Sequence, residues 1–318
     1  MDESPDVLKS WYERMVRIRF FEEKLNDLFS RNLLGGTSHF CIGQEACAVG
    51  VVSAARDTDY LVSNHRGHGH LLARGLDPYR VFAELMGRKD GFCRGRGGSQ
   101  HLCAMEKSFL GTNGITGGGI PISTGAALAL KIQKSDRIVI SFFGDGANNQ
   151  GTFHESLNMA SLWNVPVLFV CENNLYGMSI PVSASTACLP IAKRAESYCM
   201  PGVTCDGMDV VTVHRTAGDL IDRVRSGEGP ALLELKTYRF CGHSKNDQRV
   251  YRTRDEEERY AERDSLRLIR QRLRDAHVTD EDLDDLRERV AQEIDDAAER
   301  ALACEYGTPE DALGGVYA

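Results

Sequence analysis

The feature that most constrains this sequence is a carboxylate, Asp145, placed between two glycines at the end of an apolar run. The run, residues 137–143, is rich in β-branched and aromatic side chains, which is typical of a strand buried in a parallel sheet. A second such run, residues 165–171, leads to Asn174. Because the carboxyl ends of parallel strands meet at one edge of a sheet, the pattern predicts that Asp145 and Asn174 lie close together there.

The residues around Asp145 have the chemistry of a diphosphate site. Gly144 and Gly146 allow a sharp turn whose free backbone amides can face phosphate oxygens. A helix predicted from about Gln150 to Trp163 adds unpaired N–H groups and a positive dipole end. Mg²⁺ prefers hard oxygen ligands, so one carboxylate, the Asn174 amide oxygen and a loop carbonyl predict a magnesium-bound diphosphate. An isolated Gly-Asp-Gly is usually only a turn, and the surrounding strands and helix are what favour a site.

The order of predicted elements is that of a doubly wound α/β domain, with a mainly parallel sheet and helices on both faces. The other predicted elements are helices at residues 11–29, 78–86 and 121–133, a helix after Gly43, a strand ending near Ser63, and strands at residues 210–213 and 231–238. The glycine-rich stretch of residues 87–119 is predicted to be irregular, and an irregular segment of that length usually serves a function.

We expect three segments in one chain. Residues 1–42 hold an N-terminal helix and a connecting segment, residues 43–253 form the α/β domain, and residues 254–318 form a C-terminal helical extension of the same domain. The last segment is predicted because charged residues alternate there with apolar ones at helical spacing.

Composition narrows the class of protein. With 318 residues, 42% of them hydrophobic, the chain can bury one large core. A net charge of −8 argues against nucleic acid as the main partner. The ten cysteines are scattered without a Cys-x-x-Cys spacing, which favours reduced, mostly buried thiols and a cytoplasmic protein. We expect no signal peptide and no membrane span.

Several further short motifs in the sequence resemble those of a known family. They are Gly43-Gln44-Glu45-Ala46, His65-Arg66-Gly67-His68-Gly69-His70, Gly87-Arg88-Lys89, Gly97-Gly98-Ser99, Gly111-Thr112-Asn113-Gly114-Ile115, Glu172-Asn173-Asn174-Leu175-Tyr176-Gly177-Met178, Gly242-His243-Ser244 and Tyr251-Arg252-Thr253-Arg254. With the Gly-Asp-Gly turn, they resemble the alpha subunit of the two-chain, thiamine-diphosphate-dependent 2-oxo acid dehydrogenases. These are the decarboxylating first components of the pyruvate, branched-chain and acetoin dehydrogenase complexes. The resemblance runs from about Trp11 to Glu305.

The resemblance implies a thiamine-diphosphate-binding fold, thiamine diphosphate and Mg²⁺ as cofactors, and roles for individual residues. Asp145, Asn174 and a carbonyl of Tyr176 would hold the metal. His39 and His243 would line the active site and act in catalysis. The residues that it assigns to cofactor binding are His65, Arg66, Gly114, Thr116, Gly144, Asp145, Gly146, Ala147, Asn174, Arg239 and His243. Among these, Arg66 is expected to grip the diphosphate with a charge-assisted fork.

The cluster His65, His68 and His70 offers another interpretation, a zinc site. The three histidines are mixed with glycines in a loop, and no cysteine or carboxylate arrangement completes a ligand set, so the spacing does not favour zinc.

The resemblance also implies partners. In this family the aminopyrimidine ring is activated by a glutamate from a separate beta subunit, so the chain is expected to work as half of an α₂β₂ heterotetramer. The reaction implied is decarboxylation of a 2-oxo acid such as pyruvate. The acceptor implied is a lipoyl-bearing acyltransferase, with an acyl carrier protein as the alternative.

Three departures from the family pattern leave the substrate open. Thr37, Thr116 and Cys241 stand where relatives carry larger or basic side chains, which predicts a smaller or more polar pocket. Lys245 adds a cation to the loop after His243. The alternatives are therefore an acetoin dehydrogenase alpha subunit, and transketolase-like transfer of a two-carbon unit from a hydroxylated or phosphorylated ketone to a carrier protein. Outside enzymes, the chain could be a noncatalytic partner subunit.

Overall fold

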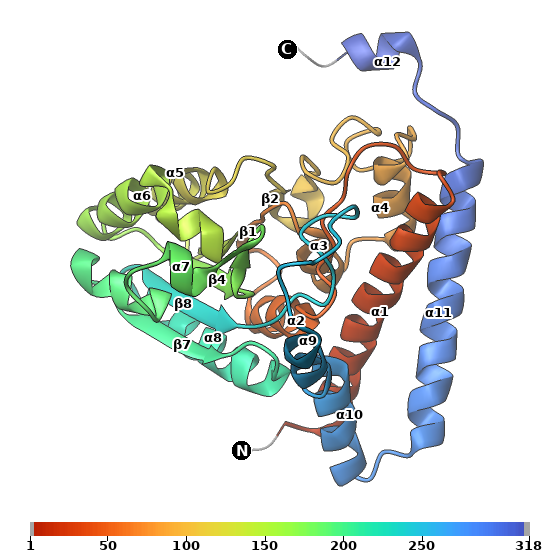
Figure 1. The fold of residues 1–318 in the computed structure, drawn as a ribbon. Helices are drawn as coiled ribbons and strands as arrows, with labels where there is room; N and C mark the ends of the chain where they lie inside the picture. Colours follow the sequence, from red (N-terminus) through yellow and green to blue (C-terminus); the bar gives the residue numbers. More distant parts are fainter. Residues whose placement is uncertain (1–2, 315–318) are drawn as a thin grey trace.

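The computed structural model describes residues 3–314, and Figure 1 shows how its elements are arranged. Residues 1–2 and 315–318, the outer ends of the expected N-terminal and C-terminal segments, lie outside the described residues. Among the described residues, no helix is both long and apolar enough to cross a membrane.

A six-stranded parallel sheet forms the centre of the fold, with the order β2-β1-β3-β4-β8-β7. Its strands are β1 (Tyr60–Val62), β2 (Phe109–Gly111), β3 (Val139–Gly144), β4 (Val167–Asn173), β7 (Gly202–Asp206) and β8 (Ala231–Lys236). A small antiparallel hairpin, β5 (Tyr176–Gly177) with β6 (Ile180–Pro181), follows β4. Its five pairings are all parallel, so the carboxyl ends of the strands lie at one edge, as the pattern of apolar runs predicted.

Helices cover both faces of this sheet, which confirms the doubly wound fold. The α-helices are α1 (Pro5–Ser30), α2 (Glu45–Ala54), α3 (His68–Ala73), α4 (Pro78–Leu85), α5 (Gly119–Ile132), α6 (Gly151–Leu162), α7 (Val182–Ser185), α8 (Val210–Arg225), α9 (Arg254–Ala261), α10 (Ser265–Asp275), α11 (Asp280–Ala303) and α12 (Pro309–Leu313). Residues 3–314 also contain three 3₁₀ helices, η1 (Met105–Lys107), η2 (Asp145–Asn149) and η3 (Ile191–Tyr198).

Alternating side chains of the strands build two separate cores. On one face Ile140 and Phe142 of β3 pack in a cluster with apolar residues of α1, α2, α4, α8, α10 and α11. On the other face Val139 and Phe143 pack with residues of α5, α6 and η3. Because neighbouring residues of a strand point to opposite faces, one apolar run serves both cores.

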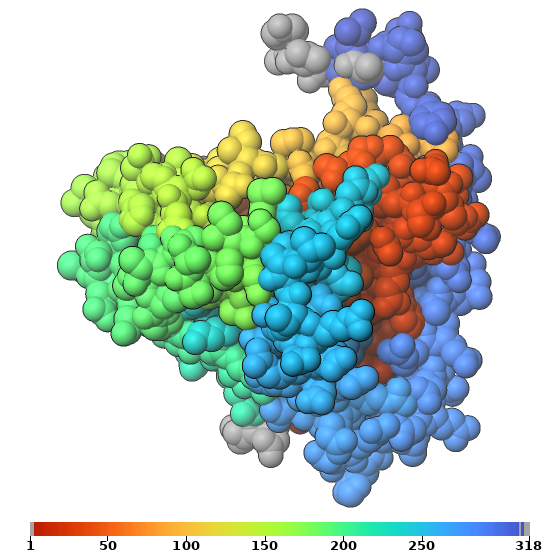
Figure 2. Space-filling view, in the orientation of Figure 1, coloured from red at the N-terminus to blue at the C-terminus, as the bar shows by residue number. Residues whose placement is uncertain are grey.

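The C-terminal residues pack against the N-terminal part of the chain, as Figure 1 shows for α11 and α1. Apolar residues at helical spacing on α11, among them Leu283, Leu286, Val290 and Ile294, are buried there. In the tail, α10 and α11 therefore cover the core, as the sequence indicated, whereas the short α12 projects away from it (Figure 1). In the space-filling view, the light-blue segment that follows β8 lies on the surface between the green middle of the chain and the orange N-terminal part (Figure 2).

Two sequence expectations are wrong, and a third holds only in part, because residues 87–119, expected to be irregular, contain η1 and the edge strand β2. Residues 210–213 were expected to form a strand, but they begin α8, whose buried residues continue at helical spacing through Val224 after an Asp209 cap. The strand at this place is β7, which is only half-buried at the sheet edge and so lacks a strong apolar run. The cysteines are all free, yet only Cys41, Cys47 and Cys171 are fully buried, because most of the others lie in loops or at element ends.

Candidate active site

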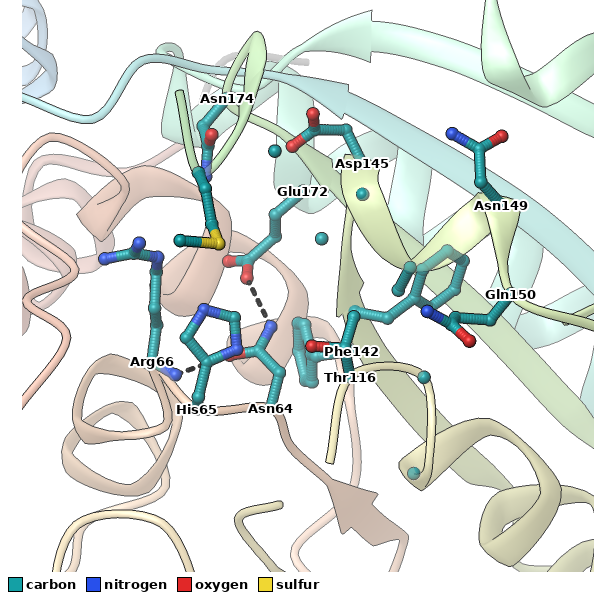
Figure 3. Close-up of a pocket in the computed structure, with 18 of the residues that line it drawn as sticks. Asn64, His65, Arg66, Thr116, Phe142, Asp145, Asn149, Gln150, Glu172 and Asn174 are labelled. Carbon is teal, nitrogen blue, oxygen red and sulfur yellow. Dashed lines mark hydrogen bonds between the residues drawn. The ribbon is translucent and has the colours of Figure 1, made fainter. Parts of the chain in front are cut away.

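The candidate site lies at the carboxyl edge of the sheet, where β3 and β4 end. β3 runs directly into η2, so that Asp145 is the first residue after the strand. β4 ends at Asn173 and delivers Asn174 beside it. Figure 3 shows Asp145 and Asn174 on one side of the site, Asn64, His65 and Arg66 on the other, and Glu172 between them with a hydrogen bond to Asn64. The sequence prediction that Asp145 and Asn174 share this edge is confirmed.

A cavity of about 310 Å³ opens at this edge. The predicted site residues among those that line it are His65, Arg66, Thr116, Gly144, Asp145, Gly146, Ala147, Asn174, Tyr176 and His243. His39, Gly114 and Arg239 were also predicted, but they are not among the lining residues. The ring of His39 lies next to those of the lining residues His65 and His243, and the charge of Arg239 contributes to lowering the pKa of His243.

Asp145 is nearly fully buried, with 2% of its surface exposed, and its Oδ2 has no hydrogen-bond partner. Burial raises the pKa of its carboxyl to about 6, against opposing contributions from its own backbone and from Arg239 and Arg66. A buried oxygen without a donor costs free energy, and a bound cation would remove that cost while favouring the ionised form. The carboxylate is therefore suited to a metal ion.

The backbone around Asp145 leaves room for a ligand. A Cβ atom at Gly144 would meet no heavy atom within 4 Å, and one at Gly146 would meet only the Cα of Gly177 at 3.5 Å. Because these two glycines have no side chains, the space beside the Asp145 carboxylate stays open. The first turn of α6, which begins at Gly151 after the cap residue Gln150, adds N–H groups without helical partners near this wall.

Glu172 is a second carboxylate in the cavity wall that the sequence analysis did not single out. It is 3% exposed and hydrogen-bonds to His70 Nε2 at 3.1 Å and Asn64 Nδ2 at 3.3 Å. His70 Nδ1 in turn meets Ser63 Oγ at 2.7 Å. Because Asn64 Oδ1 accepts the backbone N–H of Arg66 at 2.7 Å, this chain of contacts ties the end of β4 to the turn that presents His65 and Arg66.

Three histidines form one wall of the site. The ring of His39 lies 4.8 Å from that of His65 and 4.9 Å from that of His243, and the latter two are 5.6 Å apart. Burial, and then the positive charge of Arg66, lower the pKa of His39 to about 4 and that of His243 to about 3. The same causes lower the pKa of His65 well below its ordinary value. At neutral pH all three rings are uncharged, so each can donate one hydrogen bond and accept another.

The two arginines of the site are held differently from the expected fork. Arg66 donates from Nη1 to Phe40 O at 2.6 Å and from Nη2 to His243 O at 2.8 Å, so its guanidinium joins the loop of His243 to the cavity wall. Arg239 is fully buried, and its Nε and Nη1 have no partner. Burial, followed by the charge of Arg239, lowers the pKa of Arg66 to about 10. Two cations thus lie close to the cavity with only part of their hydrogen-bonding capacity used.

The loop after β8 closes on itself around Asp247. This carboxylate accepts the backbone N–H of His243 at 2.6 Å, the backbone N–H of Arg249 at 2.9 Å and the hydroxyl of Tyr251 at 2.6 Å. Burial alone would raise the pKa of Asp247, but the hydrogen bonds from His243 and Tyr251 outweigh it and lower the pKa to about 2. The loop therefore carries its own anion among its many cations.

His65, His68 and His70 do not share a metal site, because each has different neighbours. His65 faces His39 and His243. His68 lies between Glu22 and Ser99, and His70 lies between Ser63 and Glu172. His68 and His70 are buried residues of α3 that satisfy carboxylates of the core, so their spacing has a structural explanation.

Comparison with known proteins identifies the family. The family model described as "Dehydrogenase E1 component" matches residues 13–310, which is most of the chain. This chain belongs to the dehydrogenase E1 component family. The alpha subunit of acetoin:2,6-dichlorophenolindophenol oxidoreductase from Bacillus subtilis is 44% identical over 308 residues, covering 96% of this chain and 92% of that protein.

Pyruvate dehydrogenase alpha subunits are similar to nearly the same degree. The pyruvate dehydrogenase E1 component subunit alpha of Rhizobium meliloti is 40% identical over 298 residues, covering 93% of this chain and 85% of the relative. The mitochondrial somatic form from Homo sapiens is 41% identical over 301 residues, covering 94% of this chain and 76% of the relative. The resemblance seen in the sequence motifs is confirmed, and with it the assignment to an oxidoreductase of the E1 alpha type.

The E1 family implies thiamine diphosphate, and the residues of this site fit that group. The open wall at Gly144, the unpartnered Oδ2 of Asp145 and the nearby cations Arg66 and Arg239 suit an anionic diphosphate with a cation. The exposed apolar side chains of Ile115 and Met178 belong to the same cavity.

Proposed function

We propose that this chain is the alpha subunit of a thiamine-diphosphate- and Mg²⁺-dependent 2-oxo acid dehydrogenase that decarboxylates a substrate such as pyruvate and passes the acyl group to a lipoyl carrier. The observation that carries the proposal is the buried, unpartnered Oδ2 of Asp145 beside Asn174 at the open end of the sheet. Asp145, the Asn174 amide oxygen and the carbonyl of Tyr176 would hold Mg²⁺. The cofactor would supply an electron sink for breaking the bond to the substrate carboxylate.

In this proposal the chain's own residues position groups and exclude water. The backbone of Gly144, Gly146 and Ala147 and the charges of Arg66 and Arg239 would receive the diphosphate, with Thr116 and Gly114 toward the aminopyrimidine. His39, His65 and His243, uncharged at neutral pH, would offer hydrogen bonds to the reacting groups without repelling a cation there.

The chain would act only with a beta subunit in an α₂β₂ assembly, because the glutamate that activates the aminopyrimidine is expected on that partner. The proposed location of this assembly is the cytoplasm. The exposed apolar residues at the cavity mouth, Ile115, Met178 and Ile180, support a covering partner. The chain purified alone should lack activity and self-associate, which size-exclusion chromatography and a 2-oxo acid assay would check. Turnover by the lone chain would contradict the proposal.

A second substrate, acetoin, is favoured by the similarity to the Bacillus subtilis subunit. The co-expressed αβ complex should first be titrated with thiamine diphosphate and Mg²⁺ by calorimetry, and absence of binding would refute the proposed function and favour a noncatalytic subunit. The same complex should then be assayed with 2-oxo acids, acetoin and ketose phosphates, using an artificial electron acceptor and, separately, a lipoyl domain or an acyl carrier protein.

A further inference from the structure

Gln44 is a buried amide in the wall of the cavity with no role assigned above. It is 2% exposed and occupies the residue before α2, where its backbone N–H donates to Cys41 O at 2.9 Å. Its neighbours hold the chain firmly. Gly43 has a φ of +96°, and its N–H donates to both carboxylate oxygens of Glu45 at 3.1 and 3.0 Å. The side chain therefore starts from a fixed backbone position.

The orientation of the Gln44 amide follows from a chain of contacts. The backbone N–H of Tyr176 can only donate, and it meets Asn174 Oδ1 at 3.4 Å. This assigns the oxygen of the Asn174 amide and leaves its Nδ2 as the donor. Asn174 Nδ2 lies 3.1 Å from Gln44 Oε1, so the oxygen of Gln44 faces Asn174 and its nitrogen points elsewhere.

The side-chain nitrogen of Gln44, Nε2, is then left without a hydrogen-bond acceptor. Gln44 Nε2 is buried and has no hydrogen-bond partner, although Gln44 lines the cavity. Glu172, a carboxylate in the same wall, hydrogen-bonds to His70 and Asn64 and not to Gln44. A buried amide donor left unpaired costs free energy, which a ligand oxygen in the cavity would offset.

We propose that Gln44 binds the cofactor of this site directly, with Nε2–H donating to an oxygen of the bound diphosphate while Oε1 holds Asn174 in the orientation that leaves Asn174 Oδ1 for the metal. The inference rests on the proposed function. Gln44 would then have two roles. Its Nε2 would bind the diphosphate, and its Oε1 would position Asn174, the proposed metal ligand.

Two substitutions separate the two roles. Gln44→Glu keeps an acceptor oxygen for Asn174 but replaces the N–H donor with a negative charge beside the diphosphate. Gln44→Met keeps the volume and removes both contacts. In calorimetry on the αβ complex, Gln44→Glu should weaken thiamine diphosphate binding about tenfold or more at saturating Mg²⁺. Gln44→Met should weaken it as well and should also raise the Mg²⁺ concentration needed for half-saturation at saturating thiamine diphosphate, because Asn174 loses its partner.

The matched control is Gln133→Glu, the same chemical change at an exposed position after α5. It should leave both binding constants unchanged. Melting temperatures of the cofactor-free complexes show whether each variant is assembled, and if Gln44→Met does not assemble, Gln44→Glu decides. Wild-type affinity in Gln44→Glu would overturn the inference and leave the proposed function intact. Failure of the wild-type complex to bind thiamine diphosphate would overturn the proposed function itself.

Discussion

Two buried polar regions meet at the start of α2, where the adjacent residues Gln44 and Glu45 belong to different regions. The first, which we call the covering cluster, comprises Arg19, Glu45, Asp264 and Ser265 and joins α1, α2 and α10. Glu45 is fully buried and accepts hydrogen bonds from Arg19 Nε at 2.6 Å and from the Gly43 amide, while Arg19 grips Asp264 with two bonds of 3.0 Å. Burial lowers the pKa of Arg19, but Glu45 and Asp264 outweigh it and raise that pKa above its ordinary value.

The second region, which we call the strand-end edge, comprises Gln44, Asp145, Asn174 and Arg239. All four residues are buried, yet Gln44 Nε2, Asp145 Oδ2 and two nitrogens of Arg239 have no partner. Buried polar groups without hydrogen-bond partners cost folding free energy, so a fold retains them where a bound ligand or ion can supply the missing partner. The comparison teaches that buried charge alone does not mark a functional site, and that the strand-end edge differs from the covering cluster by its unpartnered polar atoms, which face the end of the sheet where the cavity opens.

The largest effect is expected at the strand-end edge. Asp145→Ala removes the single formal negative charge assigned to the metal and should weaken Mg²⁺-dependent thiamine diphosphate binding by roughly 3 kcal/mol or more. The melting temperature of the cofactor-free complex should hardly fall, because Oδ2 has no protein partner to lose. Calorimetry and thermal melting of the αβ complex measure the two quantities.

The matched variant is Asp59→Ala, at a buried aspartate that does have its partners. Asp59 pairs with Arg225 at 2.7 and 3.0 Å and accepts backbone N–H groups of Arg56 and Ile138. Asp59→Ala should therefore lower the melting temperature and leave cofactor affinity unchanged. Wild-type cofactor affinity in Asp145→Ala would remove the magnesium assignment.

The next effect concerns the covering cluster. Glu45→Gln leaves Arg19 with a neutral partner in a buried position, and it should reduce the free energy of unfolding by about 3 kcal/mol. Chemical denaturation of the complex measures this loss, with Glu299→Gln on the exposed side of α11 as a control that should change it little. If Glu45→Gln instead kept full stability and lost cofactor affinity, the division into two regions would be wrong.

The sequence predicted the local part of the strand-end edge well. A strand, a Gly-Asp-Gly turn and a second strand followed by Asn174 are short-range patterns, and parallel topology alone brings their ends together. The expected strand at residues 210–213 was wrong because it relied on a short-range pattern alone. Val210, Val211 and Val213 fit a short apolar strand, and only the longer spacing through Val224 reveals the helix.

The unpartnered atoms could not be predicted from the sequence. Whether Gln44 Nε2 has an acceptor depends on which end of the Gln44 amide meets Asn174, and these two residues belong to segments far apart in the chain. Glu172 could have been noticed as a carboxylate directly before Asn173 and Asn174. Its hydrogen bonds to His70 and Asn64 still depend on contacts between residues more than 100 positions apart in the chain.

A smaller effect is expected in the loop held by Asp247. The folded pKa of this carboxyl, about 2, lies below the ordinary value of an aspartate, so its stabilisation is present above that ordinary value and is lost as pH falls toward 2. Asp247→Asn should remove the pH dependence and speed amide hydrogen exchange at His243 and Arg249 severalfold at neutral pH. The exposed Asp219→Asn is the control. Unchanged exchange in Asp247→Asn would show that the loop does not depend on its internal anion.

The smallest effect is expected for Lys245, the cation that suggested a phosphorylated substrate. Its ammonium lies over the ring of Phe29, 4.2 Å from the centroid, its backbone N–H donates to Ser38 O at 3.2 Å, and it does not belong to the residues that line the cavity. A cation held against an aromatic ring contributes about 0.5–1 kcal/mol. Lys245→Met should therefore cost little stability and leave the KM for pyruvate unchanged. Steady-state kinetics of the αβ complex with pyruvate and with a ketose phosphate checks this. A higher KM for the phosphorylated donor alone would mean that Lys245 leaves the ring of Phe29 to bind a phosphate, which would assign this loop residue to the active site.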